Sequence, residues 1–386
     1  MSFKLTEEQE MLVKTVRDFA QKELKPKAAY WDEHEEYPHE NVKKLVELGL
    51  TGMTLPPEYG GEGRPLIDAL LVVEEIAKAC GTTARLVVET NMGVVGALMN
   101  HGTEAQKKKY LPMVRNGEKP AIAITEPDAG SAATELRTRA EKKGSNYILN
   151  GSKCFITGGG ISKIYLVFAR FEDIPGAKGI GGIFVEDGTP GLKVGKREPM
   201  MGLRGIPETQ LFFEDCVVPE ENLLVAHGDG FKKLMTAYNG QRLGAATVAL
   251  GIAQSALDEA VAYTKERKQF GRPICEFQGI QWMLAEMHTK LEAARLLLHR
   301  AAHNAGYGLP DHMEAAVAKA FTTESAVQVT NDALQLFGGY GYSREYPLER
   351  LVREARMFTI GGGTVQMLKN VIASKLLGMK ISQRRD

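Results

Sequence analysis

Cysteine is scarce in this 386-residue sequence, and long apolar runs are missing from it. The four cysteines, Cys80, Cys154, Cys216 and Cys275, are widely spaced and form no CxxC pair. This predicts reduced thiols in a cytoplasmic protein and argues against a disulfide scaffold. No apolar run reaches the length of a membrane span, and the first ten residues, MSFKLTEEQE, are too charged for a signal peptide.

An excess of either charge is also missing. Lys+Arg and Asp+Glu each total 48, so we expect no nucleic-acid partner and no membrane-surface partner. His299 and His303 have a spacing that can bind one metal, but no third ligand is evident and Arg300 stands where a metalloprotease motif has Glu. We therefore predict no metal site. No Walker A sequence occurs, and no glycine-rich turn joins a strand to a helix in the way that dinucleotide sites require.

The sequence divides into a helical, a β-rich and a second helical part. We predict an N-terminal helical domain over residues 1–118, a middle β-domain over 119–226, and a C-terminal helical domain over 227–386. Short runs rich in β-branched and aromatic residues alternate with Gly, Pro, Asp and Asn in the middle part, which predicts an antiparallel sheet or small barrel. We expect the two helical parts to pack together with the β-domain inserted between them.

Local signals place several helices. Thr6 and Gln9 have the spacing of a capping box before a helical pattern that reaches Leu24. After Gly230, four long segments have helical character, namely 231–266, 276–306, 311–337 and 364–378.

Two polar, glycine-bearing turns follow β-rich runs. The first is AITEPDAGSA, residues 123–132, and the second is NGSKCFITGGG, residues 150–160. Such turns expose backbone N–H groups and hydroxyls that can hold a phosphate or a flat ring. By composition alone they are simply connecting loops.

Five segments together are similar to the acyl-CoA dehydrogenase family. They are AITEPDAGS, NGSKCFITGG, ERKQFGRPI, QLFGGYGYSREYPLERLVREAR and GGGTVQ, in the family's order and spacing. The resemblance covers essentially the whole chain. It implies an α+β multidomain fold with an N-terminal α-helical domain, a middle β-domain and a C-terminal four-helix bundle. It also implies bound FAD, an acyl-CoA substrate and a homotetramer.

The resemblance carries binding roles onto particular residues. Those expected at the flavin ring are Ile124, Thr125, Phe155 and Thr157. Those expected at the rest of the FAD, partly that of a neighbouring subunit, are Arg267, Gln269, Phe270, Gln278, Gln335, Gly338, Gly339, Thr364 and Gln366. Those expected to contact the CoA portion are Ser131, Asn239 and Arg242.

The sequence lacks the glutamate that serves as the catalytic base in the family. Family members place a glutamate either in an I-x-E-G-T stretch, which aligns with Gly362 here, or just before the CoA-contacting arginine, which is Gln241 here. Glycine has no side chain and an amide accepts no proton near neutral pH. Three readings remain open: a relocated base such as Glu89, chemistry without α-proton abstraction, or a flavin-binding relic.

Arg85 favours the second reading. It begins a helix that in the family lines the acyl end of the cavity, where a guanidinium can hold an anionic group with two parallel hydrogen bonds. The alternative is that Arg85 merely pairs with Glu89 one helical turn on. One branch of the superfamily combines an arginine here with bound FAD and no catalytic glutamate, and it cleaves 3-sulfinopropionyl-CoA to propionyl-CoA and sulfite. That function is our prediction, with catalytic roles for Arg85, Gln241 and Gly362. The alternative is a short-chain or dicarboxylic acyl-CoA dehydrogenase, which alone would need an electron-transfer flavoprotein.

Overall fold

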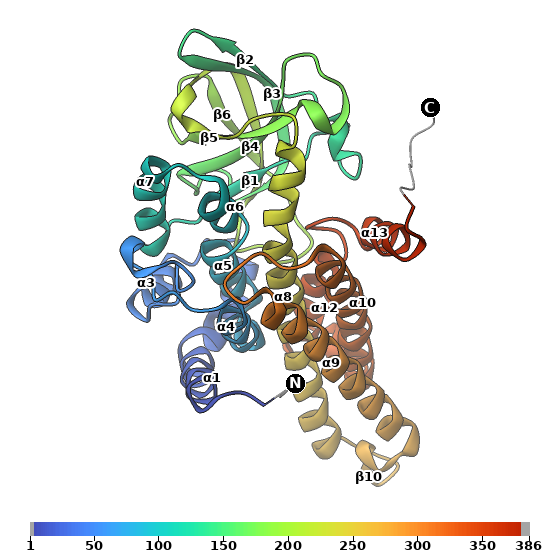
Figure 1. Cartoon of the computed structure of the whole chain (residues 1–386). Coiled ribbons are helices and arrows are strands. Elements are labelled where there is room, and N and C mark those ends of the chain that lie inside the picture. The colour runs from blue at the N-terminus through green and yellow to red at the C-terminus, as the bar shows by residue number, and fades with distance from the viewer. Residues whose placement is uncertain (1–3, 380–386) are drawn as a thin grey trace.

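The computed structural model describes residues 4–379, and its N-terminal part is entirely helical (Figure 1). The helices are α1 (Glu7–Phe19), α2 (Ala28–Glu33), α3 (His39–Glu47), α4 (Leu66–Ala79), α5 (Gly81–Asn91), α6 (Val94–His101) and α7 (Glu104–Arg115). The predicted capping box is confirmed, since Thr6 Oγ1 accepts from the Gln9 backbone and the Gln9 side chain accepts from the Thr6 backbone. Helices α4 and α5 are buried along almost their whole length, so they form the centre of this domain.

The middle part forms a mixed sheet. Its strands are β1 (Ala121–Ala123), β2 (Arg139–Lys143), β3 (Asn146–Thr157), β4 (Ile164–Phe171), β5 (Ile180–Glu186), β6 (Leu192–Arg197), β7 (Glu208–Pro219) and β8 (Leu223–Val225). The strand order is β6-β7-β3-β2-β4-β5-β8, and β1 pairs with β4. Most pairs are antiparallel as predicted, but β4 pairs in parallel with both β1 and β2. Sequence alternation does not reveal such long-range pairing, because it encodes a strand's faces and not its neighbours.

The C-terminal part is helical again. It contains α8 (Gly230–Glu266), α9 (Gln278–Ala305), α10 (His312–Phe337), α11 (Gly339–Tyr342), α12 (Leu348–Met357) and α13 (Val365–Leu377), with a small hairpin of β9 (Lys268–Gln269) and β10 (Arg272–Pro273). The four predicted long helices are present, with ends within two residues of prediction. Helix α12 was not predicted.

Single turns connect these elements. They are a π-turn at Ala20–Leu24 and 3-10 turns at Lys25–Lys27, Pro57–Tyr59, Ala133–Glu135, Gly176–Gly179, Glu220–Asn222 and Ile274–Glu276.

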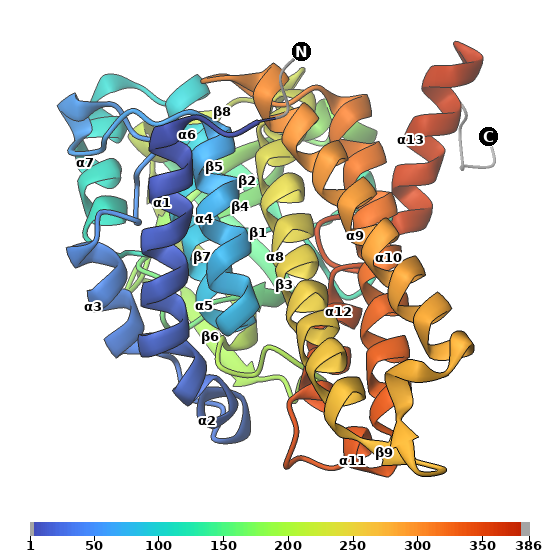
Figure 2. The same ribbon diagram turned by 90° about the horizontal axis from the view of Figure 1, so that it is seen from below.

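Helix α8 is the axis of the molecule. Its N-terminal end lies beside the β-domain and its C-terminal end reaches the far tip, where β9 and β10 turn the chain back (Figures 1 and 2). The largest apolar core joins residues of α4 and α5 to residues of α8, α9, α10 and α12, so the two helical domains share one core as expected. Helix α13 packs on α10 through a small separate cluster and stands away from the other helices (Figure 2).

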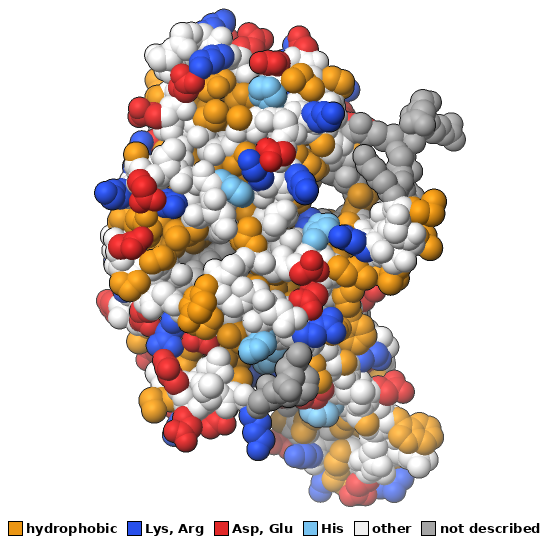
Figure 3. Space-filling model, in the orientation of Figure 1, with side chains coloured by type: hydrophobic (Ala, Val, Ile, Leu, Met, Phe, Trp, Pro, Cys, Tyr) orange, Lys and Arg blue, Asp and Glu red, His pale blue; other side chains and the backbone are white. Residues whose placement is uncertain are grey.

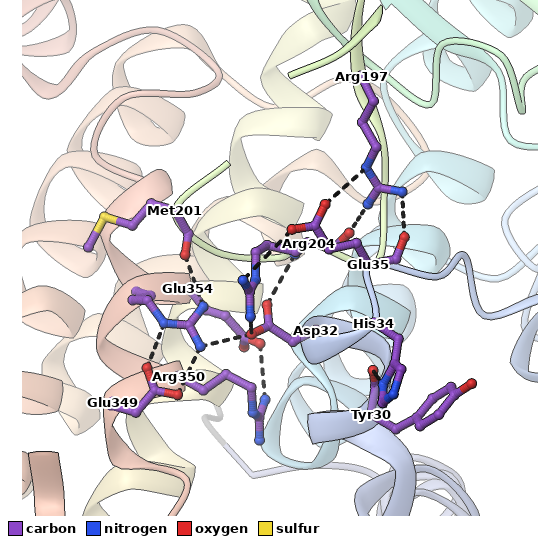
Figure 4. A network of polar contacts seen from close by, with 11 residues as sticks. Tyr30, Asp32, His34, Glu35, Arg197, Met201, Arg204, Glu349, Arg350 and Glu354 are labelled. Atoms are coloured by element: carbon purple, nitrogen blue, oxygen red, sulfur yellow. Dashed lines mark hydrogen bonds and ion pairs between the residues drawn. The ribbon is translucent and has the colours of Figure 1, made fainter. Parts of the chain in front are cut away.

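A buried carboxylate joins three distant parts of the chain (Figure 4). Asp32 in α2 accepts from Arg204 Nη2 at 3.0 Å, from a segment between β6 and β7, and from Arg353 Nη2 at 2.8 Å, from α12. Its side chain is 3% exposed. We call Asp32, Arg204 and Arg353 the ionic hub, and it fixes the N-terminal helices, the β-domain and the C-terminal helices against one another.

The surface reflects the balanced composition. On the face shown in Figure 3, blue and red side chains alternate and neither sign forms a continuous patch. Within residues 4–379 no helix is long and apolar enough to cross a membrane, and no cluster of three His, Cys, Asp or Glu side chains suits a metal ion.

Candidate active site

Arg85 lies in a buried cluster of charges between α5 and the β-domain. Its Nη2 is 3.1 Å from Glu89 Oε1 and 3.1 Å from Thr157 Oγ1, and its Nη1 is 3.4 Å from Glu208 Oε1. The pairing with Glu89 that the i, i+4 spacing allowed is therefore present, but it is one contact of three. Thr157 ends β3 and Glu208 begins β7, and the two residues pair across these antiparallel strands. The sheet thus brings two polar side chains to the helix that bears Arg85.

Lys119 completes this cluster. Its Nζ is 2.6 Å from Glu89 Oε2 and donates to the Thr157 carbonyl at 2.7 Å. Two cations, Arg85 and Lys119, therefore face two carboxylates, Glu89 and Glu208. Burial raises the pKa of Glu208 above its usual range, although Arg85 opposes this effect. Both oxygens of Glu89 lie against a cation, which makes this carboxylate a poor candidate for a mobile base.

The three glycines at 361–363 form a loop that is fixed by hydrogen bonds from a side chain of α10. Lys319 is completely buried, and its Nζ donates to the carbonyls of Gly361 and Gly363, each at 2.5 Å. Arg242 Nε donates to the Gly362 carbonyl at 3.2 Å. All three carbonyls thus accept from cations of the C-terminal helices. Burial lowers the pKa of Lys319 to about 7, and the charge of Arg242 acts in the same direction.

The space next to Gly362 is bordered by Lys319 and Tyr238. A Cβ atom built on Gly362 would lie 3.4 Å from Lys319 Nζ and 4.0 Å from the Tyr238 hydroxyl. The φ angle of Gly362 is +75°, a conformation that favours glycine. A side chain at this position would therefore project toward Lys319 and Tyr238, and in this chain neither group meets a carboxylate there.

Helix α8 carries the remaining polar residues of the site. Arg242 Nη1 donates to Asn239 Oδ1 at 2.8 Å, and His312 Nδ1 lies 3.1 Å from the same oxygen. The amide of Asn239 donates to the Pro310 carbonyl, so this wholly buried side chain has partners at both ends. Gln241 points toward the start of α6, because a Cβ on Gly93 would lie 2.6 Å from Gln241 Oε1.

The residues predicted for the flavin ring lie together at one edge of the β-domain. The Cys154 N–H donates to the Thr125 carbonyl, which places the end of β3 beside the loop after β1. Buried Lys153 fixes the same loop, since its Nζ donates to the Ile124 carbonyl at 2.9 Å and to Glu126 Oε1 at 2.8 Å. Phe155 has a φ of +54° and remains 58% exposed. The aromatic side chain of Phe155 is therefore exposed to solvent close to Thr125 and Thr157.

A second group of predicted residues lies at the far tip of the helical bundle. Five of them line a hollow of about 660 Å³, namely Arg267, Gln269, Gln335, Gly338 and Gly339. Phe270 is 93% exposed next to this hollow. Gln278 begins α9 nearby and is also exposed. The hollow is separated from the β-domain by the length of α8, which is about 55 Å for 37 residues.

The other predicted residues lie outside both groups. Thr364 caps the N-terminus of α13, and exposed Gln366 follows in its first turn. Ser131 is exposed on the loop between β1 and β2.

The whole chain matches three family profiles in succession. Residues 6–118 match the N-terminal domain of acyl-CoA dehydrogenases, residues 121–216 the middle domain and residues 228–377 the C-terminal domain. The chain belongs to the acyl-CoA dehydrogenase family.

The similar curated proteins include desulfinases and acyl-CoA dehydrogenases. The 3-sulfinopropanoyl-CoA desulfinase of Cupriavidus necator is 54% identical, over 99% of this chain and 98% of the relative. That of Variovorax paradoxus is also 54% identical, over 100% of this chain and 98% of the relative. The short-chain specific acyl-CoA dehydrogenase of Clostridium acetobutylicum is 44% identical, over 97% of this chain and all of the relative.

Solved structures of the acyl-CoA dehydrogenase family superpose closely. Butyryl-CoA dehydrogenase from Megasphaera elsdenii has a TM-score of 0.94 at 41% identity, covering 98% of this chain and all of that one. A glutaryl-coenzyme A dehydrogenase in complex with glutaryl-CoA has a TM-score of 0.93 at 36% identity, covering 100% and 99%. A glutaryl-CoA dehydrogenase from Mycobacterium smegmatis in complex with FADH2 has a TM-score of 0.91 at 28% identity, covering 98% and 97%.

Four residues of this acyl-CoA dehydrogenase-like site were missed by the sequence analysis: Lys119, Glu208, Tyr238 and Lys319. Two of them carried a signal. Tyr238 lies four residues before Arg242, so it shares a helix face with a residue that was predicted. Lys319 interrupts an alanine-rich run that has the pattern of a buried helix face. Lys119 and Glu208 had no such signal, because only the fold brings them to Arg85.

Proposed function

We propose that this protein cleaves the C–S bond of 3-sulfinopropionyl-CoA and gives propionyl-CoA and sulfite. The observation that carries the proposal is the space at Gly362, which holds a cation and a phenol within reach and no carboxylate. An enzyme that removes an α-proton needs a base near its substrate's α-carbon. A site without one suits a reaction in which carbon gains a proton.

Arg85 is the residue that we assign to the sulfinate. Guanidinium has five N–H donors in a planar fork, and the three contacts of Arg85 leave donors for a further anion. The contact to Glu208 is the longest of the three at 3.4 Å, and we expect it to yield first when a sulfinate arrives. Glu89 remains paired with Lys119, so the helix that holds Arg85 stays fixed.

FAD is the cofactor that we propose, and the residues present suit it. Exposed Phe155, close to Thr125, offers an apolar face to a flat ring, and Thr125 offers a hydroxyl group. The hollow near Arg267 offers a guanidinium and exposed aromatic side chains to a nucleotide. Bound FAD would supply a planar wall that shapes the acyl site, with no net redox change.

Two copies of the chain are needed to build one such FAD site. The flavin-ring residues and the hollow lie at opposite ends of α8, so we propose that the hollow of one subunit completes the site of another. A homotetramer provides this arrangement. For the CoA portion we propose Ser131 and Arg242 at the entrance of the site, with Asn239 orienting Arg242 through its 2.8 Å hydrogen bond. Gln241 would position the thioester or a water molecule.

The test uses the purified flavin-containing protein with no electron acceptor. We expect 3-sulfinopropionyl-CoA to release free sulfite over many turnovers while the flavin spectrum stays oxidised. Arg85→Lys should reduce the rate by at least about tenfold, because ammonium cannot form the paired hydrogen bonds. Arg300→Lys, on the exposed face of α9, serves as the matched control and should change nothing.

An absence of sulfite would refute the proposed function. In that case saturated short-chain and dicarboxylic acyl-CoAs should be added, because bleaching of the flavin would reveal a dehydrogenase with a relocated base.

A further inference from the structure

The hydroxyl group of Tyr238 is available for hydrogen bonding to a ligand. Tyr238 lies on α8 one turn before Arg242, whose guanidinium is 5.5 Å from the centre of the Tyr238 ring. The side chain is half-buried, yet its hydroxyl has no hydrogen-bond partner among residues 4–379. Its oxygen is not among the fully buried atoms that lack a partner, so the hydroxyl is open to solvent or to a ligand. The free hydroxyl is 4.0 Å from the Cβ position of Gly362, so it faces the space in which family members hold a carboxylate.

Charged groups from α8 and from the cluster around Arg85 act on the Tyr238 hydroxyl. Arg242 lies on the same helix as Tyr238, and the charges of Arg85, Glu89 and Glu208 also act on the hydroxyl. Tyr238 therefore adjoins the space at Gly362, and its hydroxyl is within electrostatic reach of the cluster that we assign to the sulfinate. A substrate whose sulfinate contacts Arg85 has its third carbon next to that cluster.

We propose that Tyr238 is the proton donor that converts the carbon released from sulfur into a methyl group. This inference rests on the proposed function. The C–S bond breaks with its electron pair on C3, C3 takes the proton from the Tyr238 hydroxyl, and sulfur leaves as sulfur dioxide. Water adds to sulfur dioxide to give hydrogen sulfite and one proton, and one proton returns to the Tyr238 phenolate. The sum consumes one water and needs no oxidant or reductant.

Other groups at the site are less suited to this step. Lys319 already donates to two carbonyls at 2.5 Å. Thr157 donates to Glu208, and guanidinium groups do not release a proton in proteins. Gln241 has an amide, which is not an acid near neutral pH. The space beyond Gly362 adjoins both Lys319 and Tyr238, which gives the phenolate a cation close to the place where its charge forms.

The experiment compares wild type, Tyr238→Phe and Tyr307→Phe with 3-sulfinopropionyl-CoA. Tyr307 is 84% exposed and serves as the matched control. We expect Tyr238→Phe to lower kcat by about 100-fold or more, with KM within a few-fold of wild type, because general acids contribute about that much to rate. The flavin spectrum and the Kd for propionyl-CoA should stay unchanged. The residual rate of Tyr238→Phe should rise with the concentration of an added buffer acid, and that of wild type should not.

The possible results distinguish an error in the proposed function from an error in the proton-donor role of Tyr238. If wild type releases no sulfite, the proposed function is wrong. If wild type releases sulfite and Tyr238→Phe stays within threefold of its kcat, the proton-donor role is wrong. A loss of activity without buffer rescue, or with an equal loss of propionyl-CoA binding, would also contradict the role. If the Phe variant fails to retain flavin, Tyr238→His must be more active than Tyr238→Leu, since only histidine can donate a proton.

Discussion

At the scale of single residues, Gly362 leaves the space beside Lys319 and Tyr238 without a side chain. The carbonyls of Gly361, Gly362 and Gly363 all accept from cations of the C-terminal helices, so the loop is well fixed although it has no side chains. A rigid loop without a carboxylate keeps the space in front of it open. It also keeps negative charge away from the anionic substrate that we propose, so the missing carboxylate would contribute to specificity.

A glutamate at position 362 should therefore convert the chemistry. In Gly362→Glu the carboxylate would enter the space beside Lys319 and Tyr238, where it would repel a sulfinate and could accept an α-proton. We expect sulfite release to fall by at least about tenfold, the cost of one unfavourable interaction of roughly 1.4 kcal/mol. Butyryl-CoA added without an acceptor should begin to bleach the flavin.

Gly362→Gln is the matched control for this substitution. It introduces the same length and the same strain at a φ of +75°, without the charge. If both variants lose sulfite release equally and neither flavin bleaches, strain and bulk explain the effect and the argument from charge is wrong.

At the scale of elements, the cluster around Arg85 joins α5 to the segment before β1 and to the ends of β3 and β7. Removing one charge from such a buried group leaves the opposite charge without a partner. Glu89→Gln would leave Arg85 and Lys119 facing Glu208 alone. We expect the free energy of unfolding to fall by about 3 kcal/mol, which urea unfolding followed by circular dichroism can measure.

Glu7→Gln, at the exposed start of α1, is the control for Glu89→Gln and should lower the free energy of unfolding by less than about 1 kcal/mol, because its charge interacts only with the helix N-terminus. An unchanged midpoint for Glu89→Gln would mean that the cluster contributes little to stability. The same variant tests the relocated base, since a dehydrogenase that used Glu89 would lose flavin bleaching with this substitution.

Helices whose ends or periodicity are encoded by neighbouring residues were predicted correctly from the sequence. The capping residue Thr6 fixed the start of α1, and the four long C-terminal helices were found from their periodicity. Helix α12 was not predicted, although Leu348, Leu351 and Ala355 have helical spacing and are buried. The parallel pairing of β1 with β4 and the meeting of Lys119 with Glu89 depend on contacts between distant segments, which no local pattern encodes.

At the scale of the whole molecule, the ionic hub in Figure 4 connects three parts of the chain through one buried carboxylate. Burial tends to raise the pKa of Asp32, but Arg353 and Arg204 outweigh it and hold the pKa below its usual range. A depressed carboxyl pKa contributes stability that is present above the unfolded-state pKa, near 4, and is lost as pH falls through the lower folded-state value.

Asp32→Asn should remove this contribution at neutral pH and lower the free energy of unfolding by about 3 kcal/mol, because two guanidinium groups lose their shared anion. The difference from wild type should shrink as the pH falls below about 4, where the carboxyl group of the unfolded chain becomes protonated, and it should disappear once the folded-state carboxylate is protonated at a lower pH. Urea unfolding at pH 7 and at successively lower pH measures both effects. A difference that stays constant with pH would contradict the role of the Asp32 charge.

The separation by α8 of the two regions that we propose to bind FAD gives a prediction for the assembly. If one FAD needs the β-domain edge of one subunit and the tip hollow of another, Phe155→Asp and Arg267→Glu should each lose flavin on their own. Phe155 is exposed at that edge and Arg267 lines the hollow, so neither substitution disturbs a core. In a symmetric pair that mixes the two variants, one of the two sites is assembled from intact parts and the other carries both defects.

Mixing equal amounts of the two variants under conditions that exchange subunits should therefore restore flavin to about a quarter of the sites, because random pairing makes half of the pairs mixed. Flavin absorbance per chain after removal of free FAD measures this directly. Mixing Phe155→Asp with the control Arg300→Lys should leave flavin at about half of the sites, the same share as before mixing, because each mixed pair has one intact site and the pairs of Arg300→Lys have two. If the two defective variants never complement each other, both regions serve the same subunit and the 55 Å estimated for α8 must be bridged within one chain.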